Sequence, residues 1–193
     1  FTKADKIQTI SRYLANWAKE MGYRGEIQVI PNGVDINRFK IQDSGFRNRL
    51  VTVSRLVEKN GVKDLIEALK FLPENIKLKI VGSGPLESEL KHHSKILNLE
   101  SRITFLGNIP NSDISKYLNE ADIFVRPSLS EGQGISFIEA MTVGLPVIAT
   151  PVGGIVDFLK DRETGLFCEV SNPKNIADKV MEYINNHELT SNI

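Results

Sequence analysis

One short segment, SLSEGQGISFIEAMTVGLPV, concentrates the residue types that could bind a charged ligand. Two glutamates, Glu131 and Glu139, flank the predicted start of a helix, and Gly132 and Gly134 precede that helix. Glycine lets the backbone approach a ligand closely, and the first turn of a helix has amide groups without an intrahelical partner. A helix N-terminus of this kind attracts anions, phosphate in particular. The segment therefore predicts a phosphate site with two carboxylates beside it.

The two glutamates are compatible with more than one chemistry. A helix that begins near Gly134 carries Glu139 on one stripe with Ile135, Ile138 and Thr142. We expect that stripe to face the sheet, where a carboxylate needs a polar partner such as the hydroxyls of a ribose or sugar. In an alternative interpretation, Glu131 is a solvated loop residue and Glu139 pairs with a buried donor. A glycosidase acid/base pair is disfavoured, because such carboxylates flank a bond from opposing walls, whereas these two follow one loop and helix.

From Leu50 onward, apolar runs of strand length alternate with helical patterns. The six predicted strands are LVTVS, KLKIVG, RITFLG, DIFVRPS, LPVIAT and GLFCEV. The helices predicted to follow them are VKDLIEALKFL, PLESELKHHSKILNL, SDISKYLNEA, GISFIEAM, GIVDFLK and PKNIADKVMEYINN. Apolar strands that alternate with helices are typical of a parallel sheet covered on both faces. The predicted fold is an α/β, doubly wound, Rossmann-like domain.

Ligands of such sheets bind beyond the carboxyl ends of the strands, so the residues that follow each strand are candidates for the site. They are Ser54, Arg55, Gly82, Ser83, Gly84, Asn108, Pro127 and the turn at Gly153 and Gly154. The Gly82–Gly84 turn superficially resembles a dinucleotide fingerprint, but Glu87 stands where the third glycine would be. We interpret it as a tight strand-to-helix turn beside the ligand crevice. The turn at Gly153 either borders the site or only redirects the chain.

The first 48 residues have a separate pattern. A strand at KIQTI leads to a helix that Ser11 can cap, and a second strand, IQVI, follows it. Residues 39–48 are polar and without a period, which is typical of a linker. The predicted domains are therefore residues 1–48, the end of one domain with its linker, and residues 49–193, a second domain.

The composition limits the classes of molecule that the chain is expected to bind. The 193 residues include 24 basic and 24 acidic side chains, so the chain has no net charge. It lacks the overall basic field that attracts nucleic acid, and the expected partner is a small charged molecule. Cys168 is the single cysteine and is interpreted as a buried structural thiol. No cluster of His, Asp and Glu follows a predicted strand, so we expect no metal.

Six segments in order resemble the blocks of one family, the retaining glycosyltransferases with the GT-B fold, which include glycogen and sucrose-phosphate synthases. The segments are VIPNGVDINRF, VSRLVEKNGVKDLIEAL, KIVGSGPLESELK, RITFLGNIPNSDISKYLNEADIFVRPS, EGQGISFIEAMTVGLPVIATPVGGIVDFL and ETGLF. The spacing of Glu131 and Glu139 resembles the E-x7-E motif of that family. The resemblance covers most of residues 29–170 and implies that residues 49–193 bind a nucleotide-diphospho-sugar, the donor.

The resemblance also implies roles for individual residues. Glu131 would accept hydrogen bonds from the transferred sugar, and Glu139 from the ribose. The backbone amides of Gly132, Gln133, Gly134 and Ile135 would hold the diphosphate and sugar. Gly82, Gly84, Asn108 and Pro127, which follow strands, would border the donor.

Two cations are implied for the diphosphate. Arg55 resembles the family arginine that neutralises the leaving group. The second family cation usually stands directly before the glycine that corresponds to Gly61, but this chain has Asn60 there. Lys59, one place earlier, is the candidate for that role.

For the whole protein, the resemblance implies transfer of a UDP- or GDP-linked hexose, with retention of configuration, to an acceptor that the sequence does not identify. The acceptor site would lie in an N-terminal domain of which residues 1–48 are the end, and the C-terminal helix would be truncated. The 193-residue chain alone is then expected to bind donor but not to transfer sugar, without metal or other cofactor. We expect a cytoplasmic enzyme, and any association with membranes would belong to the missing N-terminal domain. The alternatives are a nucleotide-sugar epimerase and a non-catalytic nucleotide-binding module.

Overall fold

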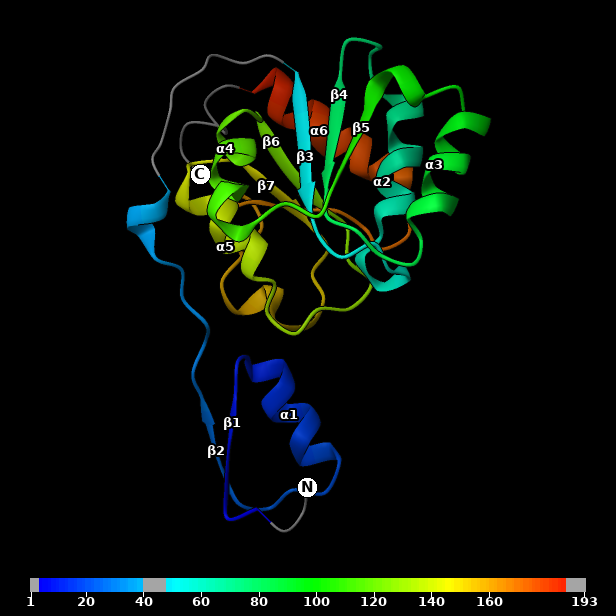
Figure 1. The fold of residues 1–193 in the computed structure, drawn as a ribbon. Coiled ribbons are helices and arrows are strands. Elements are labelled where there is room, and N and C mark those ends of the chain that lie inside the picture. Colours follow the sequence, from blue (N-terminus) through cyan, green and yellow to red (C-terminus); the bar gives the residue numbers. More distant parts are fainter. Residues whose placement is uncertain (1–3, 40–47, 187–193) are drawn as a thin grey trace.

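A six-stranded sheet dominates the computed structural model, which describes residues 4–39 and 48–186 (Figure 1). Its strands, all parallel, are β3 (Arg49–Val53), β4 (Lys77–Val81), β5 (Ile103–Gly107), β6 (Ile123–Arg126), β7 (Val147–Ala149) and β8 (Leu166–Phe167). Their order across the sheet is β5-β4-β3-β6-β7-β8. Along the chain, β4 and β5 extend the sheet on one side of β3, and β6, β7 and β8 then extend it on the other side. This reversal between β3 and β6 is the switch point at which ligands bind in doubly wound sheets.

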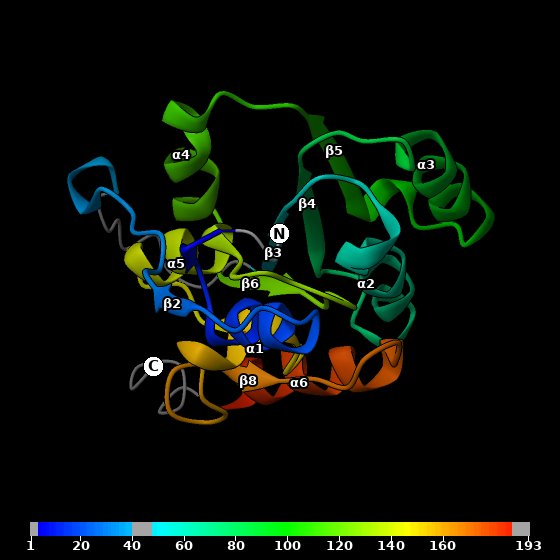
Figure 2. The ribbon, with the colours of Figure 1, turned by 90° about the horizontal axis from the view of Figure 1, so that it is seen from below.

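Helices cover both faces of the sheet (Figures 1 and 2). One face packs against α2 (Val62–Ala68), α3 (Glu87–Ile96) and α6 (Pro173–Asn185), and the other against α4 (Ile114–Asn119) and α5 (Ile135–Thr142). Because side chains alternate along a strand, Leu50 enters the first core and its neighbour Val51 the second. The predicted Rossmann-like fold is confirmed. Among the described helices, none is long and apolar enough to cross a membrane.

Two predicted elements that follow β7 differ from those observed. Residues 154–160 do not form an α-helix, since Gly153–Asp157 is a 3-10 helix, η6. Two glycines open it, and glycine has low helix propensity. The last strand is limited to Leu166–Phe167.

The helix predicted over residues 62–72 also ends early, at Ala68, and continues as a 3-10 turn, Leu69–Phe71. Arg102 accounts for this ending. Its buried guanidinium donates to the carbonyl oxygens of Leu69 and Pro73, both at 2.8 Å. The Leu69 carbonyl, at the end of the helix, therefore accepts from a side chain distant in sequence.

The N-terminal segment forms a small unit of its own: β1 (Lys6–Thr9), α1 (Arg12–Glu20) and β2 (Glu26–Val29). β1 and β2 pair in parallel, and Ser11 caps α1 by accepting from the amide of Leu14 at 3.2 Å, as predicted. The unit lies beyond the edge of the large sheet at which the strands end (Figure 1). The amide of Arg12 donates to Asp157 of η6 at 2.7 Å. The predicted linker falls mostly on residues 40–47, outside the described residues, so the domain boundary stays a prediction.

Cys168 is buried in the core beneath α6, as predicted. Burial raises the pKa of its thiol to about 12. The thiolate is therefore disfavoured, and the residue behaves as a small apolar side chain.

Candidate functional site

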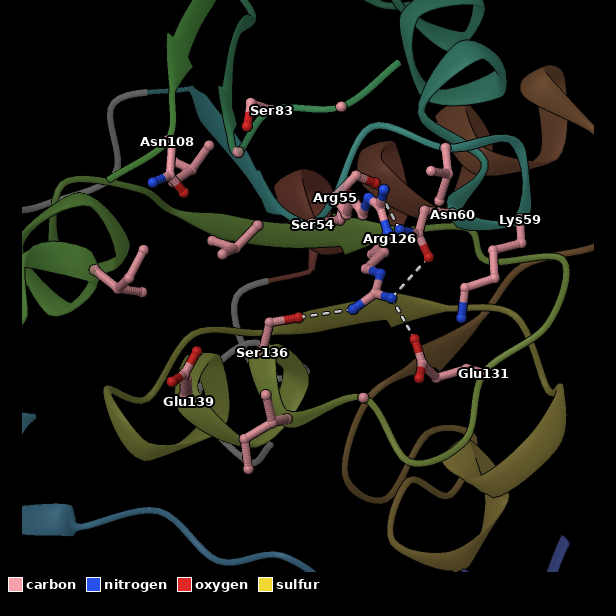
Figure 3. A pocket seen from close by; sticks show the side chains of 18 of the residues that line it. Ser54, Arg55, Lys59, Asn60, Ser83, Asn108, Arg126, Glu131, Ser136 and Glu139 are labelled. Atoms are coloured by element: carbon pink, nitrogen blue, oxygen red, sulfur yellow. Dashed lines mark hydrogen bonds and ion pairs between the residues drawn. The ribbon is translucent and has the colours of Figure 1, made fainter. Parts of the chain in front are cut away.

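A cavity of about 1550 Å³ opens at the strand ends, at the switch point between β3 and β6 (Figure 3). The lining is contributed by the segments that follow β3, β4, β5 and β6 and by the start of α5. Among the lining residues are Ser54, Arg55, Lys59, Asn60, Gly82, Gly84, Asn108, Arg126, Glu131, Gln133, Gly134, Ile135, Ser136 and Glu139. Most of the residues that the sequence places at strand ends therefore meet in one cavity.

A buried arginine occupies the centre of this site. Arg126, the last residue of β6, donates through Nη1 to Ser136 Oγ at 2.9 Å and through Nη2 to Asn60 Oδ1 at 2.9 Å. Nη2 also forms an ion pair with Glu131 Oε2. Burial lowers the pKa of Arg126, while the charge and hydrogen bond of Glu131 oppose that shift. Figure 3 shows the guanidinium between Asn60 and Glu131.

The backbone around Glu131 is fixed by close packing. Glu131 Oε1 accepts from the amide of Gly132 at 2.8 Å, and the Glu131 carbonyl accepts from the amide of Gly154 at 3.0 Å. A Cβ atom on Gly153 would lie 1.8 Å from that carbonyl oxygen. The Gly153–Gly154 turn therefore supports the loop that carries Glu131. The alternative in which Glu131 is a solvated loop residue is wrong.

Glu139 is a buried carboxylate that opens onto the cavity. It is 7% exposed and, within residues 4–39 and 48–186, makes no hydrogen bond or ion pair. Burial raises the pKa of its carboxyl group, and the charge of Arg38 offsets this shift in part. The alternative in which Glu139 pairs with a buried donor is therefore wrong for the described residues. The carboxylate is placed to accept hydrogen bonds from a ligand.

The face of α5 that contacts the sheet differs from the predicted stripe. Phe137 and Ala140 are fully buried against the sheet, whereas Ile135 is 38% exposed. The segment is apolar nearly all round, so its periodicity does not define an inward face. Gly134 precedes the helix with φ +84° and provides no side-chain cap, so no side chain competes with a ligand for the first-turn amides.

Arg55 and Lys59 are exposed cations at the rim. Their side chains make no ion pair with any residue of the described part, and both line the cavity. Their backbones are held: the Arg55 carbonyl accepts from Asn60 Nδ2 at 2.6 Å, and the Lys59 carbonyl from the amide of Leu129 at 2.7 Å. Both side chains are therefore available to an anion.

This geometry agrees with what sequence comparison finds. The family model described as "Glycosyl transferases group 1" matches residues 34–193. The chain belongs to this family. An uncharacterized glycosyltransferase of Methanocaldococcus jannaschii is 35% identical over 97% of the chain and 52% of its own length. The amylovoran biosynthesis glycosyltransferase AmsK of Erwinia amylovora is 33% identical over 92% of the chain and 47% of its own length.

Solved structures agree with the family assignment. HepE from Anabaena, in complex with UDP-glucose, superposes with a TM-score of 0.91 at 25% identity. The match covers 98% of this chain and 56% of HepE. The chain therefore has the fold of the C-terminal, Rossmann-like domain of GT-B glycosyltransferases. It spans about half the length of the curated relatives that it matches.

The two glycines after β4 are required by close packing. A Cβ on Gly82 would lie 1.9 Å from the carbonyl oxygen of Ser54, and one on Gly84 would lie 2.3 Å from that of Leu56. This contact confirms a tight turn beside the crevice. Of the other residues predicted to border a donor, Asn108 lines the cavity, whereas Pro127 and Gly132 do not.

The side chain of Gln133 is already engaged within the chain. Its Oε1 accepts from the amide of Asn32 and its Nε2 donates to the carbonyl of Asn32, each at 2.9 Å. Gln133 is buried and ties the loop after Glu131 to the segment that follows β2. Its backbone amide, not its side chain, is the group that the family resemblance assigned to the ligand.

Three side chains of the site were missed from the sequence: Asn60, Arg126 and Ser136. Asn60 was noted as a departure from the family pattern, but no function was assigned to it. A usable signal existed for Arg126, since it is the one charged residue in the apolar strand Ile123–Arg126. Buried charges are rare without a partner and often belong to sites.

Metal ligands do not gather in this cavity. Over the described ranges, no group of three or more His, Cys, Asp or Glu side chains is placed to hold a metal ion.

Proposed function

We propose that this chain is the donor-binding half of a retaining glycosyltransferase that uses a UDP- or GDP-linked hexose. The observation that carries the proposal is Glu139, a buried carboxylate without a protein partner in the described chain, which faces the cavity one helical turn after the start of α5. A carboxylate in that position suits ribose hydroxyls, and the amides of Ile135 and Ser136 at the start of α5 suit the diphosphate.

Arg55 and Lys59 would act on the diphosphate. Departure of a nucleoside diphosphate leaves negative charge on its oxygens. Two cations at the rim, which form no ion pair within the described residues, and the amides at the α5 N-terminus would stabilise that charge as it develops. The proposed site therefore works without a divalent cation.

Glu131 would bind the sugar. One of its oxygens accepts from Arg126 and the other from the Gly132 amide, so the carboxylate is held in a single orientation at the cavity wall. Carboxylate oxygens have remaining lone pairs that can accept from sugar hydroxyls.

The relatives support the same donor class. HepE, whose fold this chain shares, binds UDP-glucose, and AmsK acts in amylovoran biosynthesis. By analogy, the whole protein would transfer its sugar to an acceptor in polysaccharide or glycoconjugate biosynthesis, held by a domain outside this chain.

The experiment compares Glu131→Gln and Glu139→Gln by calorimetric titration with UDP and UDP-glucose, or with GDP and GDP-mannose if the wild type prefers guanine. Glu139→Gln should weaken nucleoside diphosphate and sugar nucleotide alike, because both contain the ribose. Glu131→Gln should weaken the sugar nucleotide alone, by roughly 1.5–3 kcal/mol, the range for a hydrogen bond to a charged group. That corresponds to about tenfold or more in Kd.

Glu163→Gln is the matched control, since Glu163 is exposed and lies outside the cavity. Each variant is checked for folding by thermal melting. Equal losses for both ligands in Glu131→Gln, or no loss in a folded Glu139→Gln, would contradict the proposed roles.

A further inference from the structure

The positive charge nearest the proposed sugar site comes from a residue that the sequence motifs do not include. We propose that Arg126 is a positioning residue that holds Glu131 in place for the sugar. This inference rests on the proposed function and adds a residue to the same site.

The buried ion pair of Arg126 and Glu131 is expected to add little to the stability of the fold. The side chain of Arg126 is 9% exposed and that of Glu131 11%, so both charges have lost most of their hydration. Such buried pairs seldom add net stability, because desolvation offsets their attraction. In addition, Nε of Arg126 is buried with no hydrogen-bond partner in the described part of the chain. A group that is costly to bury and incompletely paired is more readily explained by function.

The guanidinium joins three segments of the cavity wall. Nη1 reaches Ser136 in the first turn of α5, and Nη2 reaches both Asn60 after β3 and Glu131 after β6. A planar fork spreads its donors over separate nitrogens in one fixed geometry, whereas the three donors of an ammonium share a single atom at the end of a flexible stem. Glu131 is therefore oriented by a side chain whose own position depends on the two neighbouring segments.

Both ends of the Asn60 side-chain amide are hydrogen-bonded beside the guanidinium. Its Oδ1 accepts from Arg126, and its Nδ2 donates to the carbonyl of Arg55. A lysine at position 60 would place a second cation against the guanidinium, in a pocket where Asn60 is 3% exposed. With arginine removed, however, a lysine there could extend into the vacated space towards Glu131. A cation at position 126 or at position 60 should therefore be able to hold Glu131, but cations at both positions should not hold it better than one.

The test uses Arg126→Met, Asn60→Lys, the double variant and Arg126→Lys. Dissociation constants are measured for UDP and UDP-glucose, or for GDP and GDP-mannose, and the preference for the sugar nucleotide is their ratio. Arg126→Met should lower this preference about tenfold, the loss expected when a charge-assisted hydrogen bond is misplaced. Asn60→Lys alone should lower it as well, and the double variant should recover most of it. Arg126→Lys should be intermediate.

Two comparisons separate positioning from a structural role. In the Glu131→Gln background, Arg126→Met should have little further effect on the preference, because its action passes through Glu131. Arg102→Met is the matched control: Arg102 is similarly buried, but its hydrogen bonds within the described residues go to backbone carbonyls outside the cavity. It should lower the melting temperature and leave the preference unchanged.

The outcomes distinguish the two proposals. A wild type that binds none of the four nucleotides contradicts the proposed function, and this inference with it. A wild type that binds them, with an unchanged preference in Arg126→Met or a double variant that does not recover it, overturns this inference alone. If Arg126→Met does not fold, the double variant decides. If neither variant folds, Arg126→Lys decides. The inference is overturned if this variant prefers the sugar nucleotide as strongly as wild type does, and supported if its preference is reduced.

Discussion

At the scale of single residues, the site keeps a carboxylate where folding alone would not place one. Glu139 is buried on α5, and burial raises its pKa because the ionised form has lost solvent without gaining a partner among the described residues. The ligand proposed here would provide the missing partner. Replacing Glu139 should therefore weaken ligand binding and increase the stability of the ligand-free chain.

Glu139→Gln should make the ligand-free chain more stable at neutral pH. A carboxyl group whose pKa is raised by folding binds more protons in the folded state, so its contribution to stability falls as pH rises from its ordinary value of 4.5 through the raised one. The penalty therefore grows as pH rises above 4.5 and is relieved near pH 4. We expect the variant to melt at a higher temperature than wild type at pH 7, with the difference vanishing towards pH 4.

Thermal melting from pH 4 to pH 8 measures this effect, with Glu163→Gln as the control for loss of one surface charge. A Glu139→Gln variant that melts below wild type at pH 7 would indicate a structural partner for the carboxylate.

At the scale of elements, the positions of the strands could be predicted from the sequence, but the side-chain contacts between segments could not. LPVIAT was predicted as a strand and β7 covers Val147–Ala149, all buried, because a buried parallel strand needs a continuous apolar run. The face of α5 was mispredicted, since Phe137 and Ile138 are equally apolar and only the sheet decides which is buried. Arg126 was missed for a related reason. Its partners, Asn60 and Ser136, become neighbours through the strand order, which local patterns do not specify.

The turn that contains η6 supports the Glu131 loop, and this can be tested with three glycines. Gly153→Ala combines φ +59° with a Cβ only 1.8 Å from the Glu131 carbonyl oxygen. Gly22→Ala has φ +94° but open space, and Gly33→Ala has neither constraint. Gly22→Ala should cost about 1 kcal/mol of stability from strain alone. Gly153→Ala should cost more and Gly33→Ala almost nothing.

Urea denaturation gives the three stabilities, and nucleotide titration gives the second readout. Gly153→Ala should also weaken nucleotide binding, because the loop carrying Glu131 must move. If Gly153→Ala costs no more than Gly22→Ala and leaves affinity unchanged, the turn does not support the site.

At the scale of the whole molecule, a chain without net charge gathers charged side chains of both signs in one cleft. Arg55, Lys59 and Arg126 line the cavity, and so do Glu58, Glu131 and Glu139. Because Arg126 is paired with Glu131, the groups that suit a small anion are the exposed Arg55 and Lys59 and the N-terminus of α5. The N-terminal unit contacts the same region, through Asn32 to Gln133 and through Arg12 to Asp157. The cavity proposed to bind the donor therefore lies close to the contacts between the small unit and the large domain.

The central claim is that this chain binds a nucleoside diphosphate and its sugar conjugate by itself and without a metal. The most direct measurement is calorimetric titration of the wild-type 193-residue chain with UDP, GDP, UDP-glucose and GDP-mannose in EDTA. We predict saturable binding of one site per chain for the diphosphate and the conjugate of at least one base, with the same affinity after magnesium or manganese is added. Absence of binding to all four ligands, or binding that appears only with a divalent cation, would contradict the account.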